Sequence, residues 1–255
     1  MKRRLALLCA ALVSMASMVC IASVACAADE RKSGAEFMSA STQAMQRDDT
    51  QNPAMLWVGD GAALWQSKGC VSCHGAATRS MRGVAARYPA FDTHSKLPIN
   101  LSQRINQCTQ KRQGGAPLKA ESRDLLALEA YLAYQSRTMP VAPPKDARLA
   151  PATKRGKQLF NQRIGQLNLS CAQCHDANAG KRLAGSTIPQ GHANAYPIYR
   201  LEWQDMGSLQ RRLRNCMSGV RAVVPPYGAP ELVELELYLA ARAKGMALES
   251  PGVRP

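Results

Sequence analysis

The sequence predicts an all-α protein built from two tandem domains that are related by internal duplication. Sequence features recur in the same order in the two halves of the chain. No stretch alternates apolar and polar residues in the way that a half-buried β-strand does. A helix closes each half, because leucines recur at i, i+3 and i+7 in residues 125–132 and 232–239, with Ser122 and Pro230 as start signals.

The N-terminal segment has the pattern of an export signal. A basic start at residues 2–4 precedes an apolar run from Leu5 to about Ala25, and small residues surround Cys26. We expect residues 1–27 to be a cleaved signal peptide, which predicts a periplasmic protein without a membrane span after cleavage. A retained membrane anchor and lipid attachment at Cys26 are the alternatives.

The chain is strongly basic, with a formal net charge of +15, and it stays basic after loss of the signal segment. A basic surface attracts nucleic acids, anionic membranes or small anions. An exported protein without a basic–aromatic stripe is not expected to bind nucleic acid. The charge therefore indicates an anionic small molecule as the binding partner.

Two C-x-x-C-H motifs, at residues 70–74 and 171–175, predict two covalently bound haem c groups. In such a motif the two thiols bond the haem vinyl groups and the histidine reaches the iron. The attachment residues are Cys70, Cys73, Cys171 and Cys174, and the proximal ligands are His74 and His175. A zinc site would need further Cys or His pairs, and a redox dithiol would need a βαβ context, and neither pattern is present.

The halves repeat one another around these motifs. Gly61, Leu64 and Trp65 match Gly156, Leu159 and Phe160, and residues 101–108 match residues 209–216. Prolines concentrate between the halves, as in a stiff linker. We therefore predict a cytochrome c-like domain with the first haem at residues 28–139, a Pro-rich linker at 140–151, and a second cytochrome c-like domain with the second haem at 152–255.

The ligand opposite each histidine is predicted from position. Cytochromes commonly use a methionine ahead of the closing helix, but Met81 is near its motif, and Met206 and Met217 have no counterpart in the first half. Cys108 and Cys216 instead occupy the same place in both halves. We favour thiolate ligation of both irons over the alternative, a disulfide between these two cysteines.

Further candidates are polar residues near these cysteines. Arg104 and Arg212 precede Cys108 and Cys216 by one helical turn, and a guanidinium offers a charged fork of donors to an oxyanion. At Arg104 an ion pair with a haem propionate is an equal alternative. His94 and His192 have no counterparts and stay unassigned, although His192 precedes a polar loop that would line a cleft.

Three stretches in the second half resemble SoxA, the haem subunit of the sulfur-oxidation cytochrome complex SoxAX. These stretches are residues 199–203, 209–222 and 231–239, and the resemblance extends over nearly all of the mature chain. The complete first motif places the chain with the di-haem members.

The resemblance implies an L-cysteine S-thiosulfotransferase. Such an enzyme joins thiosulfate oxidatively to a cysteine of the carrier protein SoxYZ and passes electrons through haem to a soluble cytochrome c. It implies a mono-haem partner subunit of the SoxX type. It also implies that Cys216 is the catalytic sulfur, carried as a persulfide, and that Arg212 holds the thiosulfate anion.

Two other functions fit the same motifs. A di-haem electron carrier would have no substrate chemistry and would not depend on Arg212. A thiosulfate dehydrogenase that forms tetrathionate would need no carrier protein. The sequence around Cys216 favours the sulfur transferase.

Overall fold

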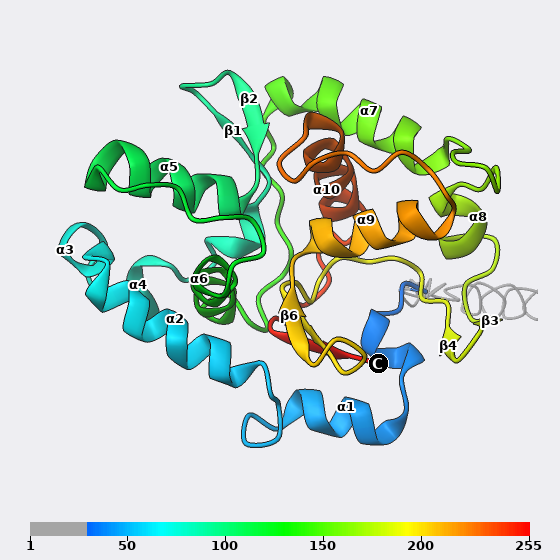
Figure 1. Ribbon diagram of the computed structural model, residues 1–255, viewed down its shortest axis with the longest axis horizontal. Helices are drawn as coiled ribbons and strands as arrows, with labels where there is room; N and C mark the ends of the chain where they lie inside the picture. Colours follow the sequence, from blue (N-terminus) through cyan, green and yellow to red (C-terminus); the bar gives the residue numbers. More distant parts are fainter. Residues whose placement is uncertain (1–29) are drawn as a thin grey trace, which may run out of the picture. The chain divides into compact units, whose positions relative to one another are not determined.

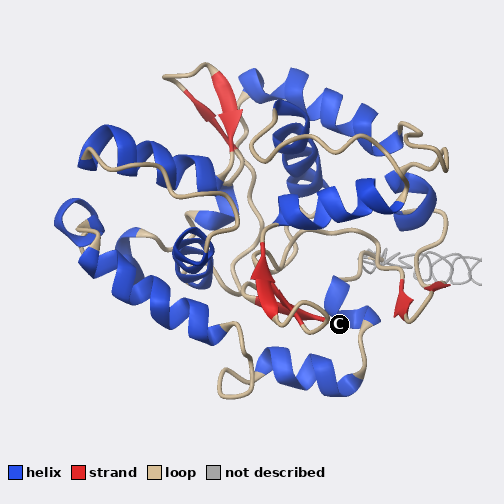
Figure 2. Ribbon diagram, viewed as in Figure 1, coloured by secondary structure: helices blue, strands red, loops and turns tan. Residues whose placement is uncertain are grey.

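The computed structural model describes residues 30–255, so the predicted signal peptide lies outside the described residues. Figures 1 and 2 show a helix-rich chain. The helices of the first half are α1 (Ala40–Arg47), α2 (Met55–Ser67), α3 (Cys70–His74), α4 (Ala77–Ser80), α5 (Leu101–Gln113) and α6 (Arg123–Tyr134). Those of the second half are α7 (Ala150–Asn161), α8 (Cys171–His175), α9 (Leu209–Gly219) and α10 (Pro230–Arg242). Short 3-10 helices are η1 (Gly34–Phe37), η2 (Ala85–Arg87) and η3 (Ala147–Leu149).

One helix pair forms the frame of each half. Helix α2 packs on α6, and α7 packs on α10. Gly61 permits the first crossing, because a Cβ there would collide with the carbonyl oxygen of Ala127. Gly156 permits the second, because a Cβ there would collide with the carbonyl oxygen of Glu234. The two glycines that the sequence aligns therefore make the same close helix approach.

The closing helices begin where the sequence predicts. Ser122 is the N-cap of α6, and its side chain accepts a hydrogen bond from the Leu125 N–H. Pro230 is the first residue of α10, where its missing N–H costs nothing. The preceding helices have similar starts, because Asn100 caps α5 and Ser208 caps α9.

The chain is rich in helices, but it also contains short strands, so it is not all-α as predicted. The strands are β1 (Ala90–Asp92), β2 (Leu97–Ile99), β3 (Arg182–Leu183), β4 (Ser186–Thr187), β5 (Ile198–Arg200), β6 (Asp205–Gly207) and β7 (Gly252–Arg254). The pairs β1–β2 and β3–β4 are antiparallel hairpins, and β5 lies between antiparallel β6 and parallel β7. Strands of two or three residues are too short to show an alternating pattern, so the sequence analysis missed them.

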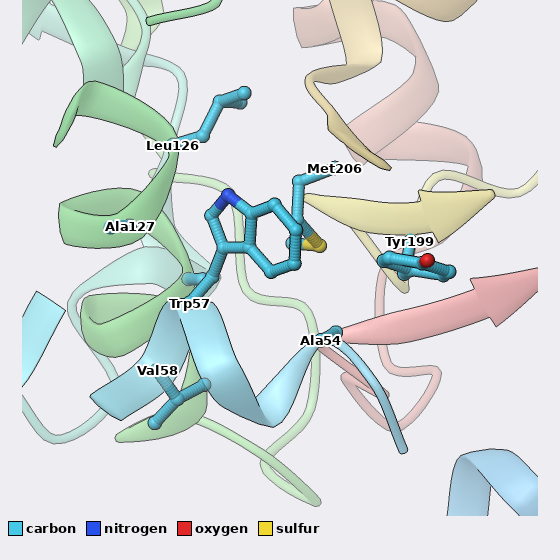
Figure 3. Packing of buried hydrophobic residues seen from close by; sticks show 8 residues of the cluster. Ala54, Trp57, Val58, Leu126, Ala127, Tyr199 and Met206 are labelled. Carbon is cyan, nitrogen blue, oxygen red and sulfur yellow. The ribbon is translucent and has the colours of Figure 1, made fainter. Parts of the chain in front are cut away.

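A hydrophobic cluster joins elements of both halves (Figure 3). Trp57 of α2 lies against Tyr199 of β5, with ring centroids 5.8 Å apart. Met206 of β6 is fully buried beside them, and Leu126 of α6 completes the contact. The second-half sheet is therefore fixed to the first-half helix pair.

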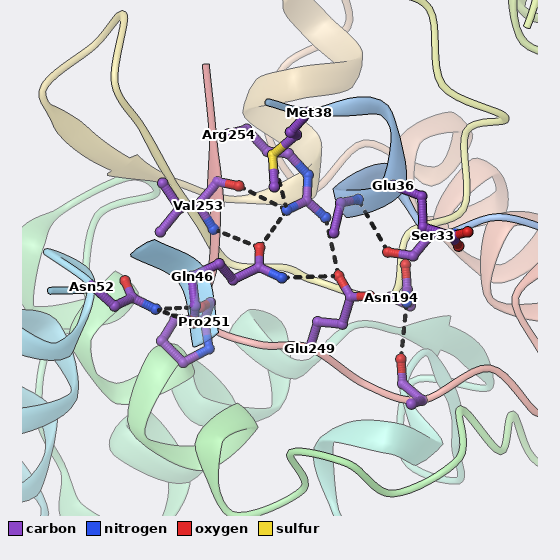
Figure 4. A network of polar contacts seen from close by, with 12 residues as sticks. Ser33, Glu36, Met38, Gln46, Asn52, Asn194, Glu249, Pro251, Val253 and Arg254 are labelled. Carbon is purple, nitrogen blue, oxygen red and sulfur yellow. Dashed lines mark hydrogen bonds and ion pairs between the residues drawn. The ribbon is translucent and has the colours of Figure 1, made fainter. Parts of the chain in front are cut away.

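A polar network ties the C-terminal strand to the beginning of the described chain (Figure 4). Gln46 of α1 accepts a hydrogen bond from the Val253 N–H at 2.9 Å and donates one to Glu249 at 3.2 Å. Arg254 pairs with Glu249 at 3.3 Å and also contacts Gln46. These bonds hold β7 in place beside β5.

The Pro-rich segment that was predicted as a linker is hydrogen-bonded along part of its length. The Val141 N–H donates to the Met246 carbonyl and the Ala142 N–H to the Ala86 carbonyl. The boundaries at 28–139, 140–151 and 152–255 stay a prediction. Across residues 30–255, no helix is long and apolar enough to cross a membrane.

Candidate haem and catalytic site

The second C-x-x-C-H motif faces a cavity of about 170 Å³. Its walls come from α7, α8, α9, α10 and the segment that leads into β5, together with parts of η1, β4 and β7. The polar and sulfur-bearing residues among those that line it include Cys171, His175, His192, Tyr196, Arg200, Arg212 and Cys216. The predicted second-half residues His175, Arg212 and Cys216 are therefore brought together in one place.

The imidazole ring of His175 is held by a backbone contact. Its Nδ1 donates a hydrogen bond to the Pro189 carbonyl at 2.8 Å, which leaves Nε2 available for a metal. Gly191 lies against the ring, since a Cβ there would be 3.0 Å from the His175 Cγ. Its φ of +72° also favours glycine. These features fit a proximal histidine that is held by its surroundings.

Cys216 faces His175 from α9. Burial raises the pKa of this thiol, but a hydrogen bond with His175 and the positive charge of Arg212 outweigh burial, and Arg200 contributes, so the net pKa is lowered. Burial raises the pKa of neighbouring Cys171 to about 11. Of these two thiols in one cavity, Cys216 is the one favoured as a thiolate, which is the nucleophilic and metal-binding form.

Three arginines line the cavity with Cys216, of which Arg254 pairs with Glu249 while Arg200 and Arg212 lower the pKa of Cys216. Arg212 lies one helical turn before it on α9, and no carboxylate among residues 30–255 pairs with Arg212. Arg200, at the end of β5, lines the same cavity. Sequence spacing predicts a polar loop at a cleft here but no role for Arg200, because strand pairing brings this side chain to the site.

The first motif faces a cavity of about 990 Å³, which is at the upper end of the usual range for cofactor sites. It is lined by residues that include Cys70, Cys73, His74, Met81, His94, Arg104 and Cys108. The Trp65 ring lies 5.6 Å from the His74 ring, and its indole N–H donates to the Gly75 carbonyl at 3.0 Å. The predicted first-half residues His74 and Cys108 thus line one cavity that fits a haem.

Arg104 has a partner of its own in this cavity. Its guanidinium pairs with Asp92 at 3.0 Å, and it also donates to Gln107 at 2.9 Å and to Tyr88 at 3.3 Å. The Ser95 backbone N–H is the main cause of a pKa of Asp92 far below its usual range, and Arg104 lowers it further. The carboxylate that pairs with Arg104 in the described chain is thus Asp92.

The structure also places the sulfur atoms of the alternative disulfide and of the candidate methionine ligands. Cys108 and Cys216 are both free thiols in different cavities, so the alternative disulfide is not formed. Met206 is part of the cluster around Trp57 and does not line the second cavity. Met217 packs against the core around Phe160, and Met81 lies in the wall of the first cavity.

The unassigned histidines each lie at a cavity: His94 lines the first and His192 the second.

Comparisons with known proteins agree with this arrangement. The family model SoxA/TsdA, cytochrome c domain, matches residues 60–141 and 155–248. The L-cysteine S-thiosulfotransferase subunit SoxA of Pseudaminobacter salicylatoxidans is 38% identical over 233 residues, which are 89% of this chain and 82% of that protein. The subunit of the same name from Rhodovulum sulfidophilum is 34% identical over 232 residues, covering 89% and 81%.

The fold agrees as well. The crystal structure of SoxXA from P. pantotrophus superimposes with a TM-score of 0.84 at 33% sequence identity, covering 88% of this chain and 87% of that one. These matches confirm the predicted resemblance and a helix-rich cytochrome c fold, which binds haem c covalently. The chain belongs to the SoxA family, whose compared members bear the name L-cysteine S-thiosulfotransferase subunit.

Proposed function

We propose that this protein joins thiosulfate oxidatively to a cysteine of the carrier protein SoxYZ. The observation that carries this function is the pairing of a buried, thiolate-favouring Cys216 with Arg212, a guanidinium that lacks a carboxylate partner among residues 30–255. A simple electron carrier would need neither feature. The names of the relatives support the same activity.

The net reaction defines what the site must do. A sulfur–sulfur bond forms between the carrier cysteine and the outer sulfur of thiosulfate, the thiol S–H bond breaks, and one proton and two electrons leave. Cys216, in the persulfide form that the resemblance implies, bonds the outer sulfur of thiosulfate with loss of one proton and two electrons. The carrier thiolate then attacks that outer sulfur and releases the Cys216 persulfide, so the conjugation is divided into two easier steps. Arg212 binds the sulfonate oxygens through charge-assisted hydrogen bonds. Bound haem supplies the path for electrons toward a soluble cytochrome c.

Each motif offers the residues for a covalent haem c group, and the first cavity, of about 990 Å³, has room for one. Cys70 and Cys73 would attach the first haem, with His74 and Cys108 as ligands of its iron. Cys171 and Cys174 would attach the second, with His175 and Cys216 as ligands. The shared glycine crossings Gly61 and Gly156 support two cytochrome c-like domains that arose by duplication. Intact mass spectrometry tests the haem count, because each haem adds its full mass.

The sequence and the structural comparison also support a location and a partner for the protein. The signal pattern at residues 1–27 supports export to the periplasm. The similarity to a crystal structure of SoxXA supports a mono-haem SoxX-type subunit as partner. Co-purification from the native source tests this complex, and a fully active lone chain would argue against it.

Mixing the holoprotein complex with thiosulfate, SoxYZ and oxidised cytochrome c tests the activity. We expect the mass of the carrier to increase by one thiosulfate adduct while cytochrome c becomes reduced. Tetrathionate as the main product, formed without any carrier, would assign the chain to the dehydrogenase reaction instead.

A further inference from the structure

Arg200 reaches the second cavity from a rigid element. It ends β5, which is paired on both edges, antiparallel to β6 and parallel to β7. β7 is held in turn by the network around Gln46 and Arg254. A side chain on such a strand is positioned with little freedom, unlike one on a surface loop.

The guanidinium of Arg200 is only partly satisfied by the chain. Its side chain is 11% exposed, and its one carboxylate contact is with Glu202, which is 65% exposed. The ring of Trp203 lies 5.1 Å from its central carbon. The buried Nε–H has no hydrogen-bond partner among the described residues. A buried charged donor without a partner is costly, so its setting is suited to an external acceptor.

Arg200 and Arg212 also bring like charges to one small space. Both line the cavity of about 170 Å³ that contains Cys216. Burial lowers the pKa of Arg200, and the charge of Arg212 lowers it further, so the two guanidinium groups disfavour each other. Repulsion between two cations in a confined site is relieved by an anion that contacts both.

We propose that Arg200 is a second anion-binding residue, which together with Arg212 holds the sulfonate end of thiosulfate so that its outer sulfur points toward Cys216. This inference rests on the proposed function for the identity of the anion. A sulfonate has three oxygens, which can accept hydrogen bonds from two guanidinium groups on different elements. Arg200 from the strand and Arg212 from the helix thereby favour a dianion over a monoanion.

Isothermal titration calorimetry with thiosulfate tests the inference without turnover, because carrier and cytochrome c are left out. The oxidised holoprotein complex is compared with Arg200→Gln, Arg200→Lys, Glu202→Gln and Arg148→Gln at one ionic strength. Arg148 is an exposed arginine paired with Asp146 outside the cavity, so its variant controls for the loss of one positive charge. Glu202→Gln removes the ion pair but keeps the Arg200 charge.

We expect Arg200→Gln to weaken thiosulfate binding by about ten- to a hundredfold, as for the loss of a charge-assisted hydrogen bond. Arg200→Lys should lie between Arg200→Gln and wild type, and the two controls should stay within about twofold of wild type. In the conjugation assay KM should rise more than kcat falls. Unchanged haem spectra and thermal unfolding would show that the variants are folded.

Equal affinity of Arg200→Gln and wild type would overturn the inference, as would Glu202→Gln losing as much affinity as Arg200→Gln. Absence of thiosulfate binding by the wild type would also overturn it. A wild type that binds thiosulfate through Arg200 but does not modify the carrier would refute the proposed function alone.

Discussion

Helices α5 and α9 carry the same pattern, an arginine one turn before a cysteine that faces a haem motif, yet their surroundings differ. In the first half the hairpin β1–β2 supplies Asp92, which neutralises Arg104. In the second half the corresponding loop supplies Arg200, which adds a positive charge beside Arg212. The comparison teaches that the chemistry of each repeat is set by the loop between the motif and the helix.

This difference explains why one half is suited to an anionic substrate. A guanidinium that is already paired with a carboxylate offers little net attraction to a second anion. Arg212 retains its charge for a ligand and lowers the pKa of Cys216. On the proposed function, we therefore expect catalysis in the second half rather than in the first.

The largest expected difference is at the cysteines. Cys216→Met retains a sulfur ligand for iron but removes the thiol that accepts the transferred sulfur, so conjugation should fall at least about a thousandfold. Cys108→Met should reduce the rate far less, because that sulfur has no covalent role. Conjugation of SoxYZ measured by carrier mass distinguishes the variants. Comparable losses in both would break the assignment of the active site.

Next in size is the effect at the arginines. Arg212→Lys keeps a charge but loses the planar fork, which should reduce kcat/KM for thiosulfate by about ten- to a hundredfold. Arg104→Lys should change this value by less than about threefold, because Arg104 is occupied by Asp92. Steady-state kinetics at varied thiosulfate provide the test. Equal impairment would mean that the two halves are not functionally distinct.

The glycine crossings should behave alike in both halves. Gly61→Ala and Gly156→Ala force a Cβ into a backbone carbonyl, so each should lower the free energy of unfolding by about 1–3 kcal/mol or more. Gly59→Ala on α2 meets nothing within 4 Å and should raise stability by roughly 0.5–1 kcal/mol. Denaturant unfolding of the holoprotein measures all three. A tolerated Gly156→Ala would contradict the shared packing.

The last comparison concerns two glutamates at equivalent positions of the closing helices. Burial raises the pKa of Glu129 to about 7 and that of Glu236 to about 8, from 4.5. The unfolded chain releases these protons near pH 4.5, but the folded chain keeps them. Stability should therefore be lost as pH rises through this window, by roughly 1.4 kcal/mol per pH unit for each proton retained.

A variant separates the two glutamates. Ser102 donates a hydrogen bond to Glu129, whereas the Oε2 of Glu236 has no partner in the described chain. Glu236→Gln should remove more of the pH dependence than Glu129→Gln, and should remove it mainly toward pH 8. Thermal unfolding between pH 4.5 and 8.5 measures the slopes, and a wild-type slope of the opposite sign would contradict the assignment.

Much of the helical frame could be predicted because helices leave local signals. The closing-helix leucines, the start signals Ser122 and Pro230, and the repeated Gly61 and Gly156 are all visible in the sequence. That His175, Arg212 and Cys216 lie at one cavity could be predicted because motif spacing and one helical turn are local patterns too.

The contacts that the sequence did not predict are those between segments far apart in the chain. Arg200 reaches the cavity because β5 pairs with β7, a strand from the end of the chain. Asp92 meets Arg104 because a hairpin folds back over α5. Met206 is excluded as an iron ligand because it is buried against Trp57 and Tyr199. No periodicity or spacing in the sequence encodes these pairings.

Peptide mass spectrometry of the holoprotein after reaction with thiosulfate and oxidised cytochrome c tests the central claim most directly. The account predicts added sulfur on the peptide that contains Cys216 and none on the peptide that contains Cys108. The thiosulfate part of this addition should pass to the carrier when SoxYZ is added. Added sulfur on Cys108, or an active enzyme whose Cys216 never carries sulfur, would contradict the assignment of catalysis to the second haem site.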